Sequence, residues 1–395
     1  MILTKKQEEG LKIAVERYIN NEPYTCISGY AGSGKSTLIS YIVAALNLYP
    51  EAVCYIAYTG KAATVLRQKG CPNAVTAHKL LYRSVPQKDG TFKFIAKDKL
   101  EEEYDLIVVD EISMLPKAMW NLLLSHKIHV IACGDPGQLP PVNAADDNEV
   151  LKSPHIFLDE IMRQAAESEI IQLSLHIREG KPLSTFKCNG KEVQIFTQKD
   201  VVDGMYSWAD QIICATNNKR NEINNFVRYK KGFAPETPSI GDKIISLKNH
   251  WDCISSRGDW ALTNGAIGEI TYFSNRNVFV PFYISENPIE VMTTNMKLED
   301  NDNFNQLLLD YKCLTTGVPA LSSKQQYQMN NSKMCPDAPY EFAYAYAITC
   351  WKAQGSEWNK VLGFEENFPF DKETHKKYLY TLTTRASEKL VLIRK

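Results

Sequence analysis

The sequence predicts an α/β protein built on parallel β-sheets, and its first third carries that prediction. Four short apolar runs rich in β-branched residues are typical of buried strands, and helical patterns such as KSTLISYIVAAL (35–46) alternate with them. The four runs lie at 24–28, 52–58, 105–109 and 128–133. This alternation indicates strand–helix–strand units, which form parallel sheets covered by helices on both faces. A glycine-rich loop between the first run and its helix fits the same fold class.

A second alternating series follows residue 165. Strand-like runs occur at 211–216, 360–364 and 389–393, and a polar helix follows the first of them. We therefore expect two domains of parallel-sheet type, since 395 residues exceed one compact domain. The expected division is 1–165 for the first domain, 166–271 with 341–395 for the second, and 272–340 for a small β-rich insertion.

A shorter insertion is expected inside the first domain, at 83–100. A Lys-Asp-Gly turn is followed there by the alternating text TFKFIAK. This pattern predicts a β-hairpin.

Composition excludes several classes of protein. The formal net charge is −1, so a nucleic-acid site has to be a local basic channel and not a basic surface overall. The ten cysteines include no CxxC pair, which argues against a zinc site and indicates reduced thiols. No apolar run is long enough to span a membrane, and the charged start MILTKKQEEG is not a secretory signal. We expect a cytoplasmic protein without membrane contact.

Residues 29–37, GYAGSGKST, match the phosphate-loop pattern between a strand and a helix. Backbone amides of such a loop and the helix N-terminus bind phosphates. Lys35 would reach the β- and γ-phosphates, and Ser36 would bind Mg²⁺. The other phosphate-binding positions of this loop are Gly29, Gly32, Gly34 and Thr37.

An acidic pair ends the third strand-like run, in LIVVDEISML (106–115). Buried carboxylates are costly unless they serve a metal or act as a base. Asp110 would hold Mg²⁺ through water, and Glu111 would orient and deprotonate the attacking water. The alternative is an ordinary strand-end pair, such as a helix cap. With the phosphate loop, the pair predicts hydrolysis of ATP or GTP.

The segment GDPGQLPPV (134–142) leaves the fourth strand-like run. The carboxyl ends of parallel strands line the ligand crevice, so Gln138 is expected near the γ-phosphate. Taken alone, the segment fits a Pro/Gly-rich turn with a solvated glutamine equally well.

The order of these motifs resembles superfamily 1 helicases, and within them the RecD/Dda type. Nearly the whole chain shares the resemblance, except the insertion, and it implies that the two parallel-sheet domains are RecA-like motor domains with the phosphate loop in the first. It implies ATP as the nucleotide, Mg²⁺ as the ion and Gln7 in LTKKQEEGL (3–11) as the base-recognising residue. LDEIMRQ (158–164) resembles the segment that offers an arginine, here Arg163, to the γ-phosphate across the cleft. LYTLTTRASEKLVLI (379–393) resembles the last motif, with Arg385 as the second arginine. Arg163 could otherwise be a helix-surface charge, and Arg385 could cap a helix C-terminus.

The same resemblance implies a site for single-stranded DNA across both domains. AYTGKAATVL (57–66), VTAHKLLY (75–82) and YAITCWKAQGSEW (346–358) are similar to its binding segments. The implied contacts to the DNA backbone come from Thr59, Lys61, His78, Thr349 and Lys352. Outside this pattern, Lys61 and His78 would be read as solvated surface residues. Trp351 stands where the family usually has histidine, and either base stacking or packing suits it.

By resemblance, the hairpin lies where these helicases place a pin that splits the duplex, with Phe92 or Phe94 at the last base pair. Anchoring the hairpin to the body is the alternative for either ring. The 272–340 segment resembles their small SH3-like insertion in position. The implied function is an ATP-dependent DNA helicase that moves 5′ to 3′. An RNA helicase of the same superfamily, or a nucleotide-switched ATPase that does not translocate, are the alternatives.

The expected partners follow from that function: single-stranded DNA, single-/double-strand junctions and unidentified replication, recombination or repair proteins. A monomeric, stand-alone motor of a bacterial or phage-infected cell is expected.

Overall fold

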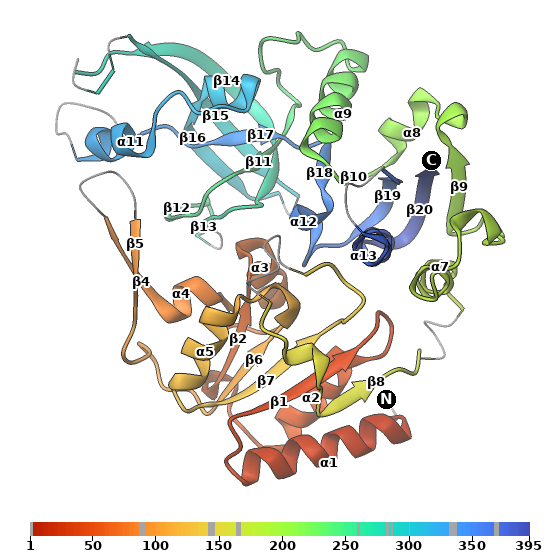
Figure 1. Ribbon diagram of the computed structural model, residues 1–395. Helices are drawn as coiled ribbons and strands as arrows, with labels where there is room; N and C mark the ends of the chain where they lie inside the picture. The colour runs from red at the N-terminus through yellow and green to blue at the C-terminus, as the bar shows by residue number, and fades with distance from the viewer. Residues whose placement is uncertain are drawn as a thin grey trace.

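The computed structural model describes residues 3–86, 92–140, 147–162, 167–258, 261–281, 284–285, 287–299, 301–331, 338–366 and 371–395. Two parallel β-sheets form two halves of the molecule, and an antiparallel sheet stands beside the second half (Figure 1). Within this described part, no helix combines the length and the apolar character that a membrane span requires.

The first half is a six-stranded sheet in the order β3-β2-β6-β7-β1-β8, with every pair parallel. Its strands are β1 (Tyr24–Gly29), β2 (Val53–Ala57), β3 (Val75–Thr76), β6 (Leu106–Val109), β7 (His129–Gly134) and β8 (Ile156–Leu158). Its helices are α1 (Lys5–Ile19), α2 (Lys35–Ala45), α3 (Gly60–Gln68), α4 (Ala77–Leu81) and α5 (Lys117–Ser125). The central strands β6 and β7 are buried along their whole length, as expected for a parallel sheet covered on both faces.

The second half is a five-stranded parallel sheet in the order β18-β10-β19-β20-β9. Its strands are β9 (Val193–Thr197), β10 (Gln211–Cys214), β18 (Ala347–Thr349), β19 (Trp358–Phe364) and β20 (Ala386–Arg394). Its helices are α7 (Glu169–Arg178), α8 (Asp203–Trp208), α9 (Asn217–Lys230), α12 (Cys350–Ala353) and α13 (Lys372–Thr383). Figure 1 shows α13 on the side of this sheet that faces the first half.

An antiparallel sheet in the order β16-β15-β14-β11-β17 interrupts the second half in sequence. It comprises β11 (Lys243–Ser246), β14 (Ile267–Val278), β15 (Ile289–Leu298), β16 (Asn303–Asp310) and β17 (Phe342–Tyr344). A two-stranded ribbon, β12 (His250–Ile254) with β13 (Ala261–Leu262), and two helices, α10 (Tyr311–Thr316) and α11 (Ser323–Asn330), accompany it. Its strands thus run from Lys243 to Tyr344.

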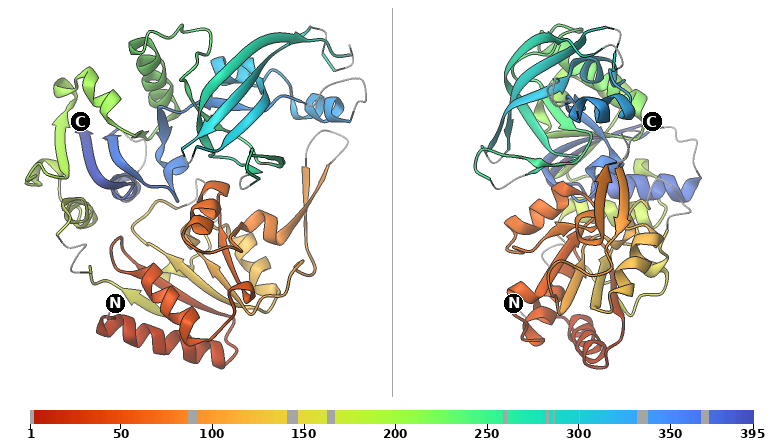
Figure 2. Two further views of the ribbon diagram at one scale, coloured as in Figure 1. Left: turned by 180° about the vertical axis from the view of Figure 1, so that it is seen from behind. Right: turned by 90° about the vertical axis from the view of Figure 1, so that its left-hand side faces the viewer.

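Two strands inserted in the first half pair antiparallel: β4 (Tyr82–Pro86) and β5 (Phe92–Ala96), with Tyr82 opposite Ala96. They project from the first half toward the antiparallel sheet (Figures 1 and 2). The expected Lys-Asp-Gly turn lies outside the described residues.

The predicted α/β class with two parallel sheets is confirmed. Each strand-like run named above contains or overlaps a strand of these sheets. The boundaries proposed for the domains stay predictions.

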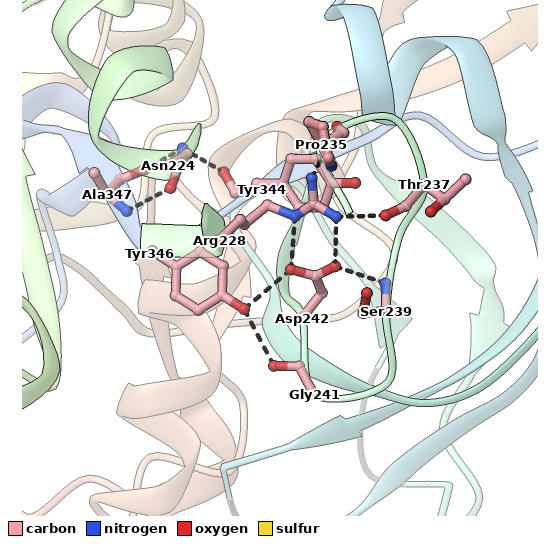
Figure 3. Close-up of polar contacts among 10 residues, drawn as sticks. All are labelled: Asn224, Arg228, Pro235, Thr237, Ser239, Gly241, Asp242, Tyr344, Tyr346 and Ala347. Carbon is pink, nitrogen blue, oxygen red and sulfur yellow. Dashed lines mark hydrogen bonds and ion pairs between the residues drawn. The ribbon is translucent and has the colours of Figure 1, made fainter. Parts of the chain in front are cut away.

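The antiparallel sheet is tied to the second half by a buried ion pair (Figure 3). Arg228 of α9 binds Asp242, just before β11, through Nε–Oδ1 at 3.0 Å and Nη2–Oδ2 at 3.2 Å. Tyr346, between β17 and β18, donates its hydroxyl to Asp242 Oδ1 at 3.0 Å. Asn224 donates to the carbonyls of Tyr344 and Ala347. The chain therefore enters and leaves the antiparallel sheet through one polar joint.

Replacing Arg228 by methionine should lower the free energy of unfolding by about 3–5 kcal/mol, because the Asp242 carboxylate would stay buried without its cation. Urea denaturation measures the change. Lys230→Met on the same helix is the matched control, since its pair with Asp203 is exposed and worth about 0–1 kcal/mol. Equal effects of the two variants would contradict the role of the joint.

Candidate nucleotide and nucleic-acid site

The phosphate loop connects β1 to α2 and has the conformation that its glycines permit. Gly34 precedes α2 with φ 79°, in the left-handed region that favours glycine. Lys35 lies at the first position of α2, and its Nζ donates to the carbonyls of Gly29 at 2.7 Å and Tyr30 at 3.0 Å. The ammonium group is thus held against the loop on which phosphates are expected to bind. Ser36 and Thr37 follow in the first turn of α2, and the Ser36 side chain is exposed.

Two segments brace this loop from outside. Gln7 is buried and forms a capping box with Thr4 at the start of α1, while its Nε2 donates to the carbonyl of Gly34 at 3.3 Å. The Met162 amide donates to the carbonyl of Gly32 at 3.0 Å. The segment that precedes Arg163 therefore lies against the phosphate loop, whereas Arg163 itself lies outside the described residues.

The acidic pair follows β6 at the carboxyl edge of the sheet. Burial raises the pKa of Asp110 to about 6, and the charge of Glu111 adds to the rise, while Lys35 opposes it. Glu111 has φ 57°, an uncommon backbone conformation for a side chain other than glycine, and opens the short helical turn Ile112–Met114. Such strain and such a shifted pKa are typical of functional sites.

Gln138 faces Glu111. Its Nε2 donates to Glu111 Oε1 at 3.1 Å, and the glutamine is 6% exposed. The other carboxylate oxygen, Glu111 Oε2, and the amide oxygen of Gln138, Oε1, are buried without a hydrogen-bond partner among the residues that the structure describes. Buried polar atoms usually have partners, so these two oxygens indicate a place for a ligand or water. Gln138 thus lies beside the acidic pair, and its expected position near a γ-phosphate stays a prediction.

The loop that carries Gln138 is held from the second half. The Leu139 amide donates to Thr381 Oγ1 at 2.9 Å, and Gln354 Nε2 donates to the Leu139 carbonyl at 2.9 Å. Tyr380 Oη donates to Asp135 Oδ2 at 2.6 Å and accepts the Ala31 amide of the phosphate loop at 2.9 Å. Residues 134–140 thus lie between the two halves and bond with both.

The arginines are placed differently from one another. Arg385 is buried and donates to the carbonyls of Thr381 and Ser356 and to Thr384 Oγ1, all within the second half. Arg178, at the end of α7, lies over the ring of Tyr30 in the phosphate loop at 3.5 Å from its centroid. No sequence signal predicts this contact of Arg178, because an arginine at a helix end has no motif of its own.

Thr59 and His78, two of the residues expected to bind DNA, lie in the first half. Thr59 caps α3 by accepting the Ala62 amide at 3.2 Å. His78 lies among the rings of Tyr58, Tyr82 and Phe94, with centroids 5.6–6.0 Å away. Burial lowers the pKa of His78 below its ordinary value, so the ring is uncharged at neutral pH and suits stacking better than charge pairing.

The other residues predicted to bind DNA differ from one another in exposure and in contacts. Phe94 on β5 is 53% exposed, as a base-contacting ring requires. In the second half, Thr349 precedes α12, Lys352 donates to Asn264 Oδ1, and Trp351 packs against the core. The side chains of Lys61 and Phe92 lie outside what the structure describes.

Tyr380, Thr381 and Asp135 make contacts that no motif in the sequence predicts. Asp135 lies inside GDPGQ, and the other two lie inside LYTLTTRAS. Within the described residues, no group of three or more His, Cys, Asp or Glu side chains could hold a metal ion.

Comparison with protein families gives two matches. Residues 3–202, half of the chain, match the AAA domain family. Residues 344–393 match the UvrD-like helicase C-terminal domain.

Several of the curated relatives are named as helicases. The chain is 26% identical over 315 residues to the ATP-dependent DNA helicase PIF1 of Candida albicans, covering 66% of the chain and 34% of that protein. It is 31% identical over 185 residues to the ATP-dependent RecD2 DNA helicase of Deinococcus radiodurans, covering 45% and 25%. It is 24% identical over 271 residues to the ATP-dependent DNA helicase dda of phage T4, covering 62% and 61%. The chain therefore spans less than two thirds of each of these relatives.

Solved structures share the fold. One is a Pif1 helicase structure that addresses DNA unwinding at forked double-stranded DNA by two coordinating Pif1 helicases. It superposes with a TM-score of 0.56 at 18% identity, covering 99% of this chain and 92% of that chain. A Bacteroides Pif1 helicase with ADP-AlF3 and ssDNA gives 0.54 at 18% identity, with the same coverage.

Replacing Asp110 by asparagine should stabilise the protein at pH 8 by about 2–3 kcal/mol, because ionising this carboxyl in the folded chain is unfavourable. Below the unfolded pKa of about 4, this acid is neutral in both the folded and the unfolded chain, so the gain should vanish there. The gain should grow as pH rises from that value to the folded pKa of about 6, and level off above it. Thermal unfolding between pH 4 and 8 measures the difference.

Asp105→Asn is the control, since this acid is exposed at the other end of the same strand. A gain for Asp110→Asn that is equal at pH 4 and pH 8 would contradict the assignment.

Proposed function

The chain belongs to the AAA domain family and is a superfamily 1 helicase of the RecD/Dda type, and from that premise we propose that it is an ATP-dependent DNA helicase that translocates 5′ to 3′. One observation carries the proposal: the loop of Gln138 bonds with Glu111 on one side and with the second half on the other. A switch that only binds nucleotide needs no such connection. The polarity rests on likeness to Pif1 and Dda helicases.

ATP would bind on the phosphate loop, with Lys35 neutralising its β- and γ-phosphates. Gly29, Gly32, Gly34 and Thr37 would complete the loop, and Gln7 beside it would read the base. Ser36 and Asp110 offer the oxygen ligands that Mg²⁺ prefers, together with water and phosphate oxygens. The bound ion would supply charge neutralisation on the phosphates.

Glu111 would take the proton of the attacking water. Its Oε1 is oriented by Gln138 Nε2, and its Oε2 has no partner among the described residues, so one oxygen is fixed and the other available. Gln138 would contribute its own Oε1 to the same water or detect the γ-phosphate. The pair thus forms an oriented base of the kind that phosphoryl transfer to water requires.

Arginines from the second half and from its border with the first would stabilise the transferring phosphoryl group. Arg163 fits this role, because its neighbour Met162 already contacts the phosphate loop. Arg385 follows Tyr380 and Thr381, which contact the first half, although its guanidinium bonds within the second half. Reaching the nucleotide would require Arg385 to exchange those bonds when the halves close.

Single-stranded DNA would lie across both halves, on Thr59, Lys61, Thr349 and Lys352. Lys352 belongs to α12, and Gln354 follows directly and donates to the Leu139 carbonyl. A phosphate that shifts α12 would therefore shift the residue next to Gln138. This short connection would link DNA binding to hydrolysis.

The rings at the base of β4 and β5 would contact bases. His78, Tyr82 and Phe94 form a cluster, and base–aromatic stacking is worth about 1–3 kcal/mol per base. Phe92 or Phe94 on the hairpin would meet the duplex at the junction. Trp351 is proposed to pack and not to stack, because it lies against the core.

Unwinding of duplexes with a single-stranded tail on one end tests the function. Protein with ATP and Mg²⁺ should separate a 5′-tailed duplex and leave a 3′-tailed one intact. An all-RNA version of the 5′-tailed duplex should be separated more slowly, since DNA is the proposed substrate. Strand release is followed by fluorescence of a labelled strand.

Glu111→Gln serves as the control, because it keeps the fold and the nucleotide loop but removes the base. It should bind tailed DNA and release no strand. Unwinding of only the 3′-tailed duplex would overturn the polarity, and hydrolysis that ignores DNA would favour the non-translocating switch.

A further inference from the structure

We infer that Tyr380 is a positioning residue that couples closure of the two halves to ATP hydrolysis, an inference that rests on the proposed function. Its phenol joins three segments at one atom. Tyr380 Oη accepts the Ala31 amide of the phosphate loop at 2.9 Å and donates its proton to Asp135 Oδ2 at 2.6 Å. The side chain comes from α13 of the second half, and both partners belong to the first.

The contact is buried and directional. Tyr380 and Asp135 are each 1% exposed, so water does not replace their hydrogen bond. The hydroxyl has one proton to donate, and the Asp135 carboxylate receives it. Asp135 uses its other oxygen to accept the Gly137 amide at 2.8 Å. The phenol therefore fixes a carboxylate that itself shapes the turn before Gln138.

Gly137 leaves room for the ring. A Cβ at this position would lie 2.9 Å from Tyr380 Cε1 and 3.1 Å from Cζ, closer than packed carbons approach. Contact with the second half, and not only the turn, thus explains why a glycine occupies position 137.

The contacts of Tyr380 help to hold the loop that carries Gln138. Its loop is bonded to the second half at Asp135 and, through the backbone of Leu139, to Thr381 and Gln354. Gln138 lies between these two anchors, and its Nε2 reaches Glu111 only while they hold. Movement of α13 away from the first half would release the Ala31 and Asp135 bonds together, so the base would lose its orientation when the halves open.

A second buried tyrosine on α13 offers a comparison. Tyr378 is two residues earlier, and its hydroxyl donates to the Phe364 carbonyl at 2.6 Å inside the second half. Both tyrosines are buried on one helix; the Tyr380 hydroxyl bonds to Ala31 and Asp135 of the first half, whereas the Tyr378 hydroxyl bonds to Phe364 of the second half. A general effect of losing a buried hydroxyl is therefore separable from loss of the coupling.

The test is steady-state ATP hydrolysis of Tyr380→Phe with saturating single-stranded DNA. DNA-stimulated kcat should fall about tenfold, as expected for losing a hydrogen bond to a charged group, while KM for ATP stays within about twofold. Tyr378→Phe should keep kcat within about twofold. Asp135→Asn combined with Tyr380→Phe should lose no more than the worse single variant, since both act through one bond.

Gly137→Ala is a second test of the same inference, because the added methyl would displace the Tyr380 ring without removing its hydroxyl. This variant should reduce DNA-stimulated kcat as well. A Tyr380→Phe kcat within twofold of the parent, equal losses for Tyr378→Phe, or additive losses in the double variant would overturn the inference. Absence of DNA-stimulated hydrolysis in the parent chain would instead overturn the proposed function.

Discussion

The candidate site depends on the backbone of Leu139. Its amide and its carbonyl are both buried, and each finds its hydrogen-bond partner in the second half, at Thr381 and Gln354. A buried peptide group without a partner is costly, so the loop after β7 takes this conformation only against the second half. The neighbouring side chain, Gln138, orients Glu111. The two sheets, which share no strand, are therefore connected where the chemistry is expected.

The same constraint accounts for unfavourable features of the site. Asp110, Glu111 and Asp135 bring carboxylates close to one another, and burial raises the pKa of Asp110 and of Asp135. Glu111 adopts a strained backbone. A fold selected only for stability would avoid these arrangements, whereas a site that binds a cation and positions a water needs them. Lys35 lowers the cost by opposing the rise of both pKa values.

Local patterns were sufficient to predict the strands, the phosphate loop and the acidic pair, because each depends on residues that are neighbours in sequence. The loop of Gln138 was predicted to lie near the site, but its anchors were not, since Thr381 lies 242 residues beyond Leu139. The burial of Arg385 and the uncharged state of His78 also depend on packing that no spacing reveals. Arg163, Lys61 and Phe92 stay predictions about side chains.

The most direct measurement is ATP hydrolysis by Gln354→Ala with and without single-stranded DNA. This variant removes the donor to the Leu139 carbonyl and leaves the nucleotide loop and the proposed DNA-binding side chains in place. The account predicts that it binds ATP and DNA as the parent does, while DNA no longer accelerates hydrolysis. Undiminished acceleration at full DNA occupancy would contradict the claim that the two sites communicate through Leu139.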